Sequence, residues 1–230
     1  DGPTAIDVLQ TEQTVANMSQ GSSPFVIMGG LVEDKRLPQV QLLTEKAIYD
    51  AVLKMIQSAK SEEHLDMAMF YLSERNIIEA LKQAKQRGVN IRIMLDPNKD
   101  AFGRQKNGIP NRPVASELNA VGIPIRWCDT HGEQCHSKML LKYNAQQAEL
   151  MLGSANFTAR NLKNYNLETD MRVLGSAQTQ VFKDAGQYFD AAWSNANGRQ
   201  ITVDYVKYAD DSKVKYWLYR FMEWSGLSTF

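Results

Sequence analysis

Polar residues that could do chemistry together gather in the second half of the chain, and they are His136, Lys138, Ser154, Asn156 and Glu168. Side chains two residues apart on a strand point to the same face, so His136 and Lys138 are expected to emerge side by side. Ser154 and Asn156 belong to the polar segment GSAN, which predicts a turn at a strand end, and Glu168 arrives on the next predicted strand. We therefore expect an imidazole, an ammonium, a hydroxyl, a carboxamide and a carboxylate to converge.

These groups suit displacement at a phosphodiester without a metal or any other cofactor. A phosphoryl group in transit carries negative charge on its equatorial oxygens and needs donors placed in advance, which Lys138, Ser154 and Asn156 supply. A neutral imidazole nitrogen can attack phosphorus, and a carboxylate on its other nitrogen fixes the tautomer and strengthens the nucleophile. Glu168 is the candidate for that carboxylate on His136.

The elements before these residues alternate between helix and strand. Residues 43–60 place apolar side chains at helical spacing behind a cap at Thr44. Residues 64–72 predict a strand, and Ser73 is expected to cap a second helix. Residues 89–95 alternate and predict another strand. A strand, a helix and a strand in succession favour a parallel pair joined by a right-handed crossover.

Residues 96–113 are rich in Gly, Pro, Asn and Asp and predict a loop long enough to line a site. Its basic residues Lys99, Arg104 and Lys106 are interpreted as a solvated edge, with contact to a phosphate or a headgroup as the alternative. The alternation then continues as helix 114–122, strands 123–129, 138–142, 150–153 and 167–175, and helix 177–193.

Composition places the chain among globular domains and excludes several classes. Of its 230 residues, 43% are hydrophobic and 23% are charged. Its 26 basic and 26 acidic residues cancel, so no field of one sign draws the whole molecule onto nucleic acid or an anionic membrane. No apolar run approaches the ~20 residues that span a bilayer, and the amino terminus lacks the features of a secretion signal. Since the chain begins without Met, we interpret it as a processed or fragmentary product.

Two cysteines, Cys128 and Cys135, bracket a short polar loop. A local disulfide and two buried thiols both fit this spacing. A zinc site with His131 and His136 is the least favoured interpretation, because the spacing lies outside the usual zinc patterns, and no metal is expected. The cysteine pair favours a periplasmic, secreted or membrane-associated location over a cytoplasmic one.

The order of His136, Lys138, the GSAN segment and Glu168 resembles the HxK…GSxN…E signature of the phospholipase D superfamily. The lead-in AIYDAVLKMIQSAK and IIEALKQAKQRGVNIRIMLD is similar to that of the family, so the resemblance covers roughly residues 40–195. The segments LDPNKDAFGRQKNGIPNRPVASEL and RFMEWSGLSTF are similar to bacterial lipid-acting members, the phospholipase D and cardiolipin synthase type enzymes.

The resemblance implies an α/β fold with a mixed sheet flanked by helices, and hydrolysis or phosphatidyl transfer on phospholipids through a phosphohistidine. It also implies that the catalytic residues are His136, Lys138, Ser154, Asn156 and Glu168. One position departs from the family pattern, which would place Asp at residue 143, where this chain has Tyr143. In the family that Asp is regarded as supporting, so we expect the change to affect the local hairpin more than the chemistry.

The family also implies a second HxK motif, from the other half of one chain or from an identical subunit, and this chain has one. Residues 2–10 and 175–183 share a turn glycine, a helix start and an apolar pair, which indicates a repeat. We therefore expect residues 1–39 to be the tail of a preceding repeat and a linker, 40–198 the catalytic domain, and 199–230 an aromatic-rich helical tail. The chain would then be the carboxy-terminal half of a pseudo-twofold, two-lobed enzyme.

The partners implied are a phospholipid or other phosphodiester substrate and either the amino-terminal half of the same enzyme or a second copy. In a two-half enzyme His136 would usually be the general acid, whereas in a homodimer it could take either role. The aromatic stripe in residues 217–224 is interpreted as core packing, with peripheral membrane contact as the alternative. Two other functions stay open: a nucleic-acid phosphodiesterase, which the neutral net charge disfavours, and a non-catalytic half that completes a partner's site.

Overall fold

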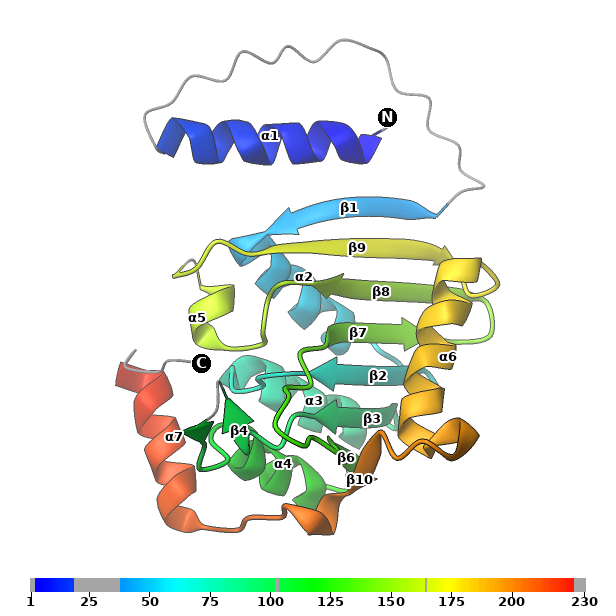
Figure 1. The fold of residues 1–230 in the computed structure, drawn as a ribbon. Coiled ribbons are helices and arrows are strands. Elements are labelled where there is room, and N and C mark those ends of the chain that lie inside the picture. The colour runs from blue at the N-terminus through cyan, green and yellow to red at the C-terminus, as the bar shows by residue number, and fades with distance from the viewer. Residues whose placement is uncertain (1–2, 19–37, 102–103, 164, 226–230) are drawn as a thin grey trace.

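The computed structural model describes residues 3–18, 38–101, 104–163 and 165–225. An eight-stranded mixed sheet forms the centre, with helices on both of its faces (Figure 1). The strands are β1 (Gln39–Thr44), β2 (His64–Met69), β3 (Asn90–Leu95), β4 (Asp100–Ala101), β5 (Arg104–Gln105), β6 (Ile125–Cys128), β7 (Lys138–Tyr143), β8 (Gln147–Gly153), β9 (Thr169–Ser176) and β10 (Thr202–Asp204). The helices are α1 (Pro3–Met18), α2 (Glu45–Gln57), α3 (Arg75–Gln86), α4 (Asn111–Ala120), α5 (Ala159–Leu162), α6 (Gln180–Ser194) and α7 (Lys213–Ser225).

Strand order in the large sheet is β1-β9-β8-β7-β2-β3-β6-β10. β2 pairs in parallel with β3, and β3 pairs in parallel with β6, while the other neighbours are antiparallel. The predicted strand–helix–strand unit is confirmed as β2, α3 and β3. The α/β class and the mixed sheet flanked by helices are confirmed as well.

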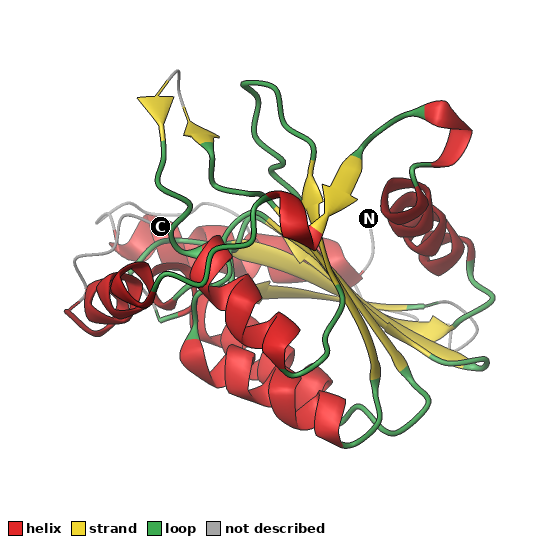
Figure 2. Cartoon of the chain, turned by 90° about the horizontal axis from the view of Figure 1, so that it is seen from below, coloured by secondary structure: helices red, strands yellow, loops and turns green. Residues whose placement is uncertain are grey.

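Two hydrophobic clusters fill the space between the sheet and its helices. The larger joins one face of the sheet to α2, α3 and α4, and the smaller joins the other face to α6. Figure 2 shows the sheet nearly edge-on between these layers. The helical spacing read from residues 43–60 is confirmed, because the buried side chains of α2 are Ile48, Ala51, Val52, Met55 and Ile56.

Two local expectations need correction, and a third is confirmed. The residue that caps α3 is Glu74, whose carboxylate accepts a hydrogen bond from the Ile77 amide at 3.0 Å, whereas Ser73 donates to Glu223 of α7 at 2.5 Å. The predicted loop over 96–113 contains the β4–β5 hairpin, and α4 begins within it. Residues 39–44 form a strand that pairs with β9, and α2 begins at Glu45 directly behind Thr44, which confirms the predicted cap position.

The early start of α4 has a clear cause in Asn111, which is buried. Its side-chain amide donates to the backbone oxygens of Phe70 at 2.7 Å and Asp96 at 2.8 Å, and this fixes the first turn against the ends of β2 and β3. Pro113 lies in that first turn, where its missing N–H removes no intrahelical hydrogen bond.

The ends of the chain extend the central body. α1 contacts the edge strand β1, and residues 19–37 of the expected linker lie outside the described residues. After residue 198, β10 pairs with β6 and α7 packs against α4. Within the described ranges, no helix has the length and the apolar character that a bilayer span requires.

Candidate active site

One edge of the sheet collects the predicted site residues. β2 ends there, β7 begins there, β8 ends there and β9 begins there, because β7 runs antiparallel to both β2 and β8, and β9 runs antiparallel to β8 (Figure 1). Lys138 is therefore the first residue of β7, opposite Met69, while Gly153 is the last residue of β8, opposite Asp170. The alternation of helix and strand thus brings residues more than thirty positions apart to one place.

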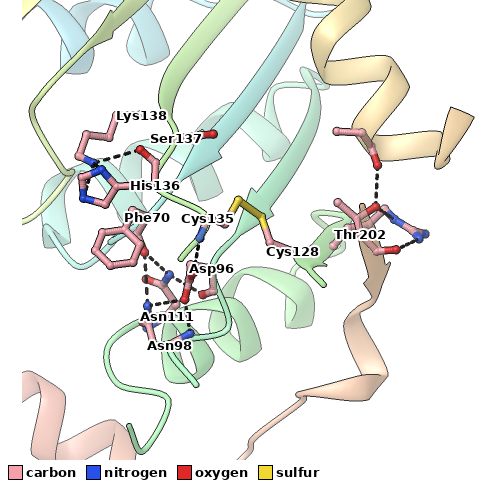
Figure 3. The surroundings of a disulfide bond; sticks show 12 residues. Phe70, Asp96, Asn98, Asn111, Cys128, Cys135, His136, Ser137, Lys138 and Thr202 are labelled. Atoms are coloured by element: carbon pink, nitrogen blue, oxygen red, sulfur yellow. Dashed lines mark hydrogen bonds between the residues drawn. A yellow bond between two sulfur atoms is a disulfide. The ribbon is translucent and has the colours of Figure 1, made fainter. Parts of the chain in front are cut away.

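His136 and Lys138 lie side by side, as their spacing predicts (Figure 3). The Lys138 Nζ is 3.2 Å from Nδ1 and 3.3 Å from Nε2 of His136. The imidazole also packs on Phe70, with ring centroids 4.7 Å apart. Desolvation, together with the charge of Lys138, lowers the pKa of His136, so the ring is neutral at neutral pH. A neutral ring is the form that can attack phosphorus.

Lys138 is a buried cation. Its side chain is 9% exposed, and burial lowers the pKa of its ammonium, while Glu168 and Asp170 oppose that change. Among the residues that the structure describes, it forms no ion pair, and the hydrogen bonds of its ammonium go to His136. Such a charge is only partly neutralised, which makes this corner attractive to an anion.

The Gly153–Asn156 turn follows β8 and is held at each residue. Ser154 donates from its amide to the Thr169 oxygen at 3.1 Å, and the Ala155 amide donates to Asp170 at 3.1 Å. The Asn156 side-chain oxygen accepts from the Tyr71 amide at 3.2 Å. The carboxamide nitrogen carries the donors of this side chain, so it is the atom that can donate to a substrate.

Glu168 lies immediately before β9 and is buried. Its carboxylate accepts from the Ser154 hydroxyl at 2.5 Å and from the Asn161 amide of α5. The hydrogen bond expected between Glu168 and His136 is not among the contacts of the described residues. Glu168 therefore lies in the expected corner, but its hydrogen-bond partners among the described residues are Ser154 and Asn161.

Asp170 and Asn161 are residues of this corner that sequence reasoning missed. Asp170 is 2% exposed, and burial, opposed by the Ala155 amide, raises its pKa to about 6. The sequence did contain a signal for Asp170. It lies two residues after Glu168 in the predicted strand 167–175, and that spacing places the two side chains on the same face. Charged residues are rarely buried in a strand, so a charged residue at such a position is a candidate for the functional site.

Of the interpretations of the cysteines, the structure has the disulfide between Cys128 and Cys135 (Figure 3). It ties the end of β6 to the residue that precedes His136. The Cys135 amide also donates to the Asp96 carboxylate at 2.8 Å. The approach to His136 is therefore fixed at two points. In the described part of the chain, no group of His, Cys, Asp and Glu could hold a metal.

Tyr143, which departs from the family pattern, lies away from this corner. It ends β7, and at about 3.3 Å per residue it is roughly 16 Å from Lys138 along the strand. Because the spacing is odd, its side chain is on the opposite face, where it stacks on His64 at 4.8 Å. Burial raises its pKa to about 12, and Asp66 forms a hydrogen bond with it.

The basic residues of the 96–113 segment have partners within the fold. Lys99 donates to the Thr130 oxygen at 2.6 Å, and Lys106 donates to the Tyr71 hydroxyl. Since the Tyr71 amide binds Asn156, Lys106 belongs to the surroundings of the site. The side chain of Arg104 lies outside the described residues.

Comparisons with known proteins agree with this arrangement. No curated protein matches the chain. Nuc, a phospholipase D family member from Salmonella typhimurium, has a solved structure that matches with a TM-score of 0.56 and 22% identity, over 73% of this chain and 98% of that chain. Phosphatidylserine synthase from Haemophilus influenzae matches with a TM-score of 0.61 and 10% identity, over 95% of this chain and 52% of that chain. These identities show a shared fold and no more.

Comparison with protein families identifies the family of the chain. The family described as cardiolipin synthase, PLD-like domain, matches residues 52–193, which include His136, Lys138, the Gly153–Asn156 turn and Glu168. Membership of the phospholipase D superfamily supports phosphodiester chemistry in general, by hydrolysis or by transfer. Because the match covers more than half of the chain, this protein belongs to the family of phospholipase D-like domains of the cardiolipin synthase type.

Proposed function

We propose that this chain catalyses hydrolysis of phospholipid phosphodiesters, or phosphatidyl transfer between alcohols, without a metal and through a phosphohistidine. The observation that carries the proposal is the Lys138 ammonium within 3.3 Å of both ring nitrogens of His136. Next to this pair, the Gly153–Asn156 turn offers the amide of Asn156. The Ser154 hydroxyl, whose one proton goes to Glu168, has to turn from that carboxylate to donate to a substrate. An anionic phosphoryl group held there has a nucleophile and several donors within reach.

The proposed reaction has two steps. In the first, a histidine ring nitrogen forms a bond to phosphorus while the bond to the leaving alcohol breaks, and that alkoxide takes a proton from a general acid. In the second, water or another alcohol gives its proton to that same group and attacks phosphorus, which frees the imidazole. Lys138, Ser154 and Asn156 stabilise the charge on the non-bridging oxygens in both steps.

A second imidazole is the proposed general acid, so we propose that the chain works with another HxK site, in an amino-terminal half or in a second copy. Phosphatidylserine synthase, of which this chain matches 52%, supports the two-half alternative by its length. The lowered pKa of His136 favours the nucleophile role for it. For His136 to be the general acid instead, the partner half must raise that pKa, for example by adding a carboxylate.

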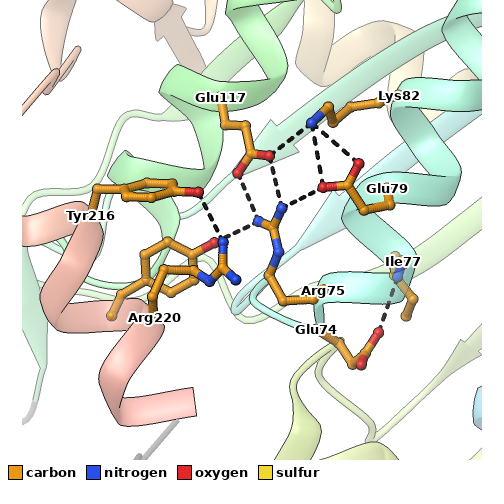
Figure 4. A network of polar contacts seen from close by, with 9 residues as sticks. Glu74, Arg75, Ile77, Glu79, Lys82, Glu117, Tyr216 and Arg220 are labelled. Atoms are coloured by element: carbon orange, nitrogen blue, oxygen red, sulfur yellow. Dashed lines mark hydrogen bonds and ion pairs between the residues drawn. The ribbon is translucent and has the colours of Figure 1, made fainter. Parts of the chain in front are cut away.

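Helix α7 supports lipid as the substrate class. Its exposed apolar side chains follow the spacing of one helix face, and they are Val214, Trp217, Leu218, Phe221 and Trp224. Figure 4 shows what holds its inner side, where Arg75 of α3 binds the Tyr219 hydroxyl at 2.7 Å and the Glu117 carboxylate of α4 at 2.7 and 2.8 Å. Tryptophan and phenylalanine on a fixed helix suit the interface of a bilayer, and we propose that this face contacts it.

The deciding test compares two substrates. The full chain, alone and with its partner half if one co-purifies, is incubated with phosphatidylglycerol vesicles and separately with plasmid DNA, each with a metal chelator present. Headgroup release or a transphosphatidylation product, detected by mass spectrometry, supports the proposal. Plasmid cleavage without lipid turnover would replace lipid by nucleic acid, and inactivity with both halves present would indicate a non-catalytic half.

Matched histidine variants identify the group responsible. His136→Ala is expected to abolish turnover and His131→Ala to leave it unchanged, because the side chain of His131 is 73% exposed in the Cys128–Cys135 loop. A covalent phosphohistidine, trapped by rapid acid-free quenching, should appear on His136 if it is the nucleophile. Turnover that survives His136→Ala would refute the proposal.

The disulfide also supports a proposal about the cellular compartment of the protein. A bond between Cys128 and Cys135 persists in an oxidising compartment, so we propose a periplasmic, secreted or membrane-associated location. Alkylation of intact cells before lysis, followed by mass spectrometry of the peptide with both cysteines, checks it. Two alkylated thiols in the native protein would place the chain in a reducing compartment.

A further inference from the structure

Asp170 lies inside the candidate site and has no part in the chemistry proposed above. On β9 it is paired with Gly153 of β8, and the β7–β8 register continued by one residue places Lys138 opposite the same Gly153. Lys138, Gly153 and Asp170 therefore form one row across three strands, with their side chains on one face. Since glycine has no side chain, β8 places no side chain between Lys138 and Asp170 in that row, and although the two form no direct ion pair, the charge of Asp170 raises the pKa of the Lys138 ammonium.

The space above Gly153 is filled by Asp170 itself. A Cβ placed on Gly153 would lie 2.2 Å from Asp170 Oδ1, which no side chain tolerates. The same oxygen accepts from the Ala155 amide at 3.1 Å. The carboxylate thus lies against Gly153 and Ala155 of the turn, next to Ser154 and Asn156, the proposed donors to the substrate.

We propose, resting on the function proposed above, that Asp170 is a positioning residue: its carboxylate fixes the Gly153–Asn156 turn and is the counter-charge that holds Lys138 beside His136. It touches neither the substrate nor the reacting atoms. Its action passes through the Ala155 amide on one side and through the Lys138 ammonium on the other.

The charged groups that face Asp170 are few. β7 contributes Lys138, the segment before β9 contributes Glu168, and the paired residues on β8 and β1 are the uncharged Gly153 and Leu43. Burial raises the pKa of Asp170 to about 6, the Ala155 amide and Lys138 oppose this, and Glu168 adds to it. Asp170 is therefore ionised at neutral pH, and the counter-charge is lost as the pH falls through about 6.

Asp170→Asn separates the two tasks, because the Asn oxygen still accepts from Ala155 while the charge is removed. We expect kcat to fall on the order of tenfold, KM to change by less than about twofold, and the acid limb of the kcat profile near pH 6 to disappear. Asp66→Asn is the matched control, since it neutralises another buried Asp on the opposite face of the sheet and should leave kcat and its pH profile unchanged.

A second measurement does not depend on turnover. In lysine-labelled protein, the Lys138 side-chain NMR signal, assigned with Lys138→Arg, should titrate at lower pH in Asp170→Asn, because Asp170 raises the pKa of that ammonium. If the unaltered protein has no lipid activity, the proposed function fails and this titration alone decides the role of Asp170. An unchanged Lys138 titration, an unchanged kcat, or a rise in KM alone would overturn the inference.

Discussion

Two groups of buried charges lie on opposite faces of the same sheet. On the α6 face, Asp66 of β2 is 1% exposed and accepts two hydrogen bonds from Arg92, at 2.8 and 2.7 Å. Arg92 also pairs with Asp190 of α6 at 2.8 Å, and its guanidinium lies over the Phe189 ring at 4.9 Å. The hydrogen bonds to Asp66 raise the pKa of Arg92 above its ordinary value. Folding therefore favours the charged form.

At the site edge the opposite holds. Burial lowers the pKa of Lys138, and it raises the pKa of Asp170 to about 6. The lysine has no ion-pair partner among the described residues, and the two carboxylates near it accept hydrogen bonds from the backbone, Ser154 and Asn161 instead. Here folding disfavours the charged forms of both groups.

The difference separates a structural charge cluster from a functional one. Charges that exist to hold the fold are arranged so that each meets its partner, whereas charges that bind an anion must keep part of their potential free. On the proposed function, a phosphoryl group that binds there would recover the stability lost at Lys138.

The largest effect is expected for Lys138→Met. Removal of a preorganised donor at a developing negative charge reduces kcat by roughly 100- to 1,000-fold. Stability should not fall, because a lysine whose pKa is lowered by folding makes the charged protein less stable, and Met keeps the volume of the stem. Steady-state kinetics and urea unfolding of the same preparation check both parts. A variant that loses stability along with activity would place Lys138 in the structural class.

Arg92→Met should do the reverse. It leaves Asp66 buried without its partner, and loss of one member of a buried pair costs about 3–5 kcal/mol of unfolding free energy. The kcat per folded molecule should stay unchanged, since the cluster lies on the other face. Chemical denaturation gives the first quantity, and active-site titration with turnover gives the second. A lower kcat in fully folded Arg92→Met would show that the two faces are coupled.

Asp170→Asn should stabilise the fold while it lowers activity. A carboxyl group whose folded pKa is raised contributes stability that is present below its unfolded value near 4 and is lost as the pH rises through about 6. At about pH 8 the neutral Asn avoids that loss, and we expect a gain on the order of 2 kcal/mol that disappears near pH 4. Unfolding curves at the two pH values decide it, and equal stability at both would contradict the assignment.

Much of this site was readable from the sequence because its signals are local. His136 and Lys138 share a face through a spacing of two, and the GSAN segment marks a strand end by composition alone. The helical spacing of the apolar residues in 43–60 predicted which side chains of α2 are buried. Each of these signals depends on residues close together in the sequence, for which the local backbone geometry determines the direction of the side chains.

What the sequence could not supply depends on pairing between distant strands. Asp170 matters because β9 meets β8 with Gly153 opposite it, and that register is visible only in the folded sheet. Residues 39–44 become a strand because β9 offers an edge to them. Likewise, the contact of Glu168 with Asn161 depends on how the short helix α5 folds back over the site. The local sequence pattern determines which side chains lie near the site edge of the sheet. The register of the paired strands determines which of those side chains are neighbours.

The smallest effect on kcat is expected for Tyr143→Asp, because of the position of residue 143 on β7. This change restores the family's residue at that position, yet kcat should change by less than about twofold, because residue 143 lies on the α6 face at the far end of β7. Its effect should fall on stability, since a carboxylate would face Asp66, with which the Tyr143 hydroxyl now bonds. Tyr143→Phe, which only removes that hydroxyl, should lose about 1 kcal/mol and serves as the control. A gain in kcat from Tyr143→Asp would mean that residue 143 acts on the site across the sheet, and the division between the two charge clusters would then fail.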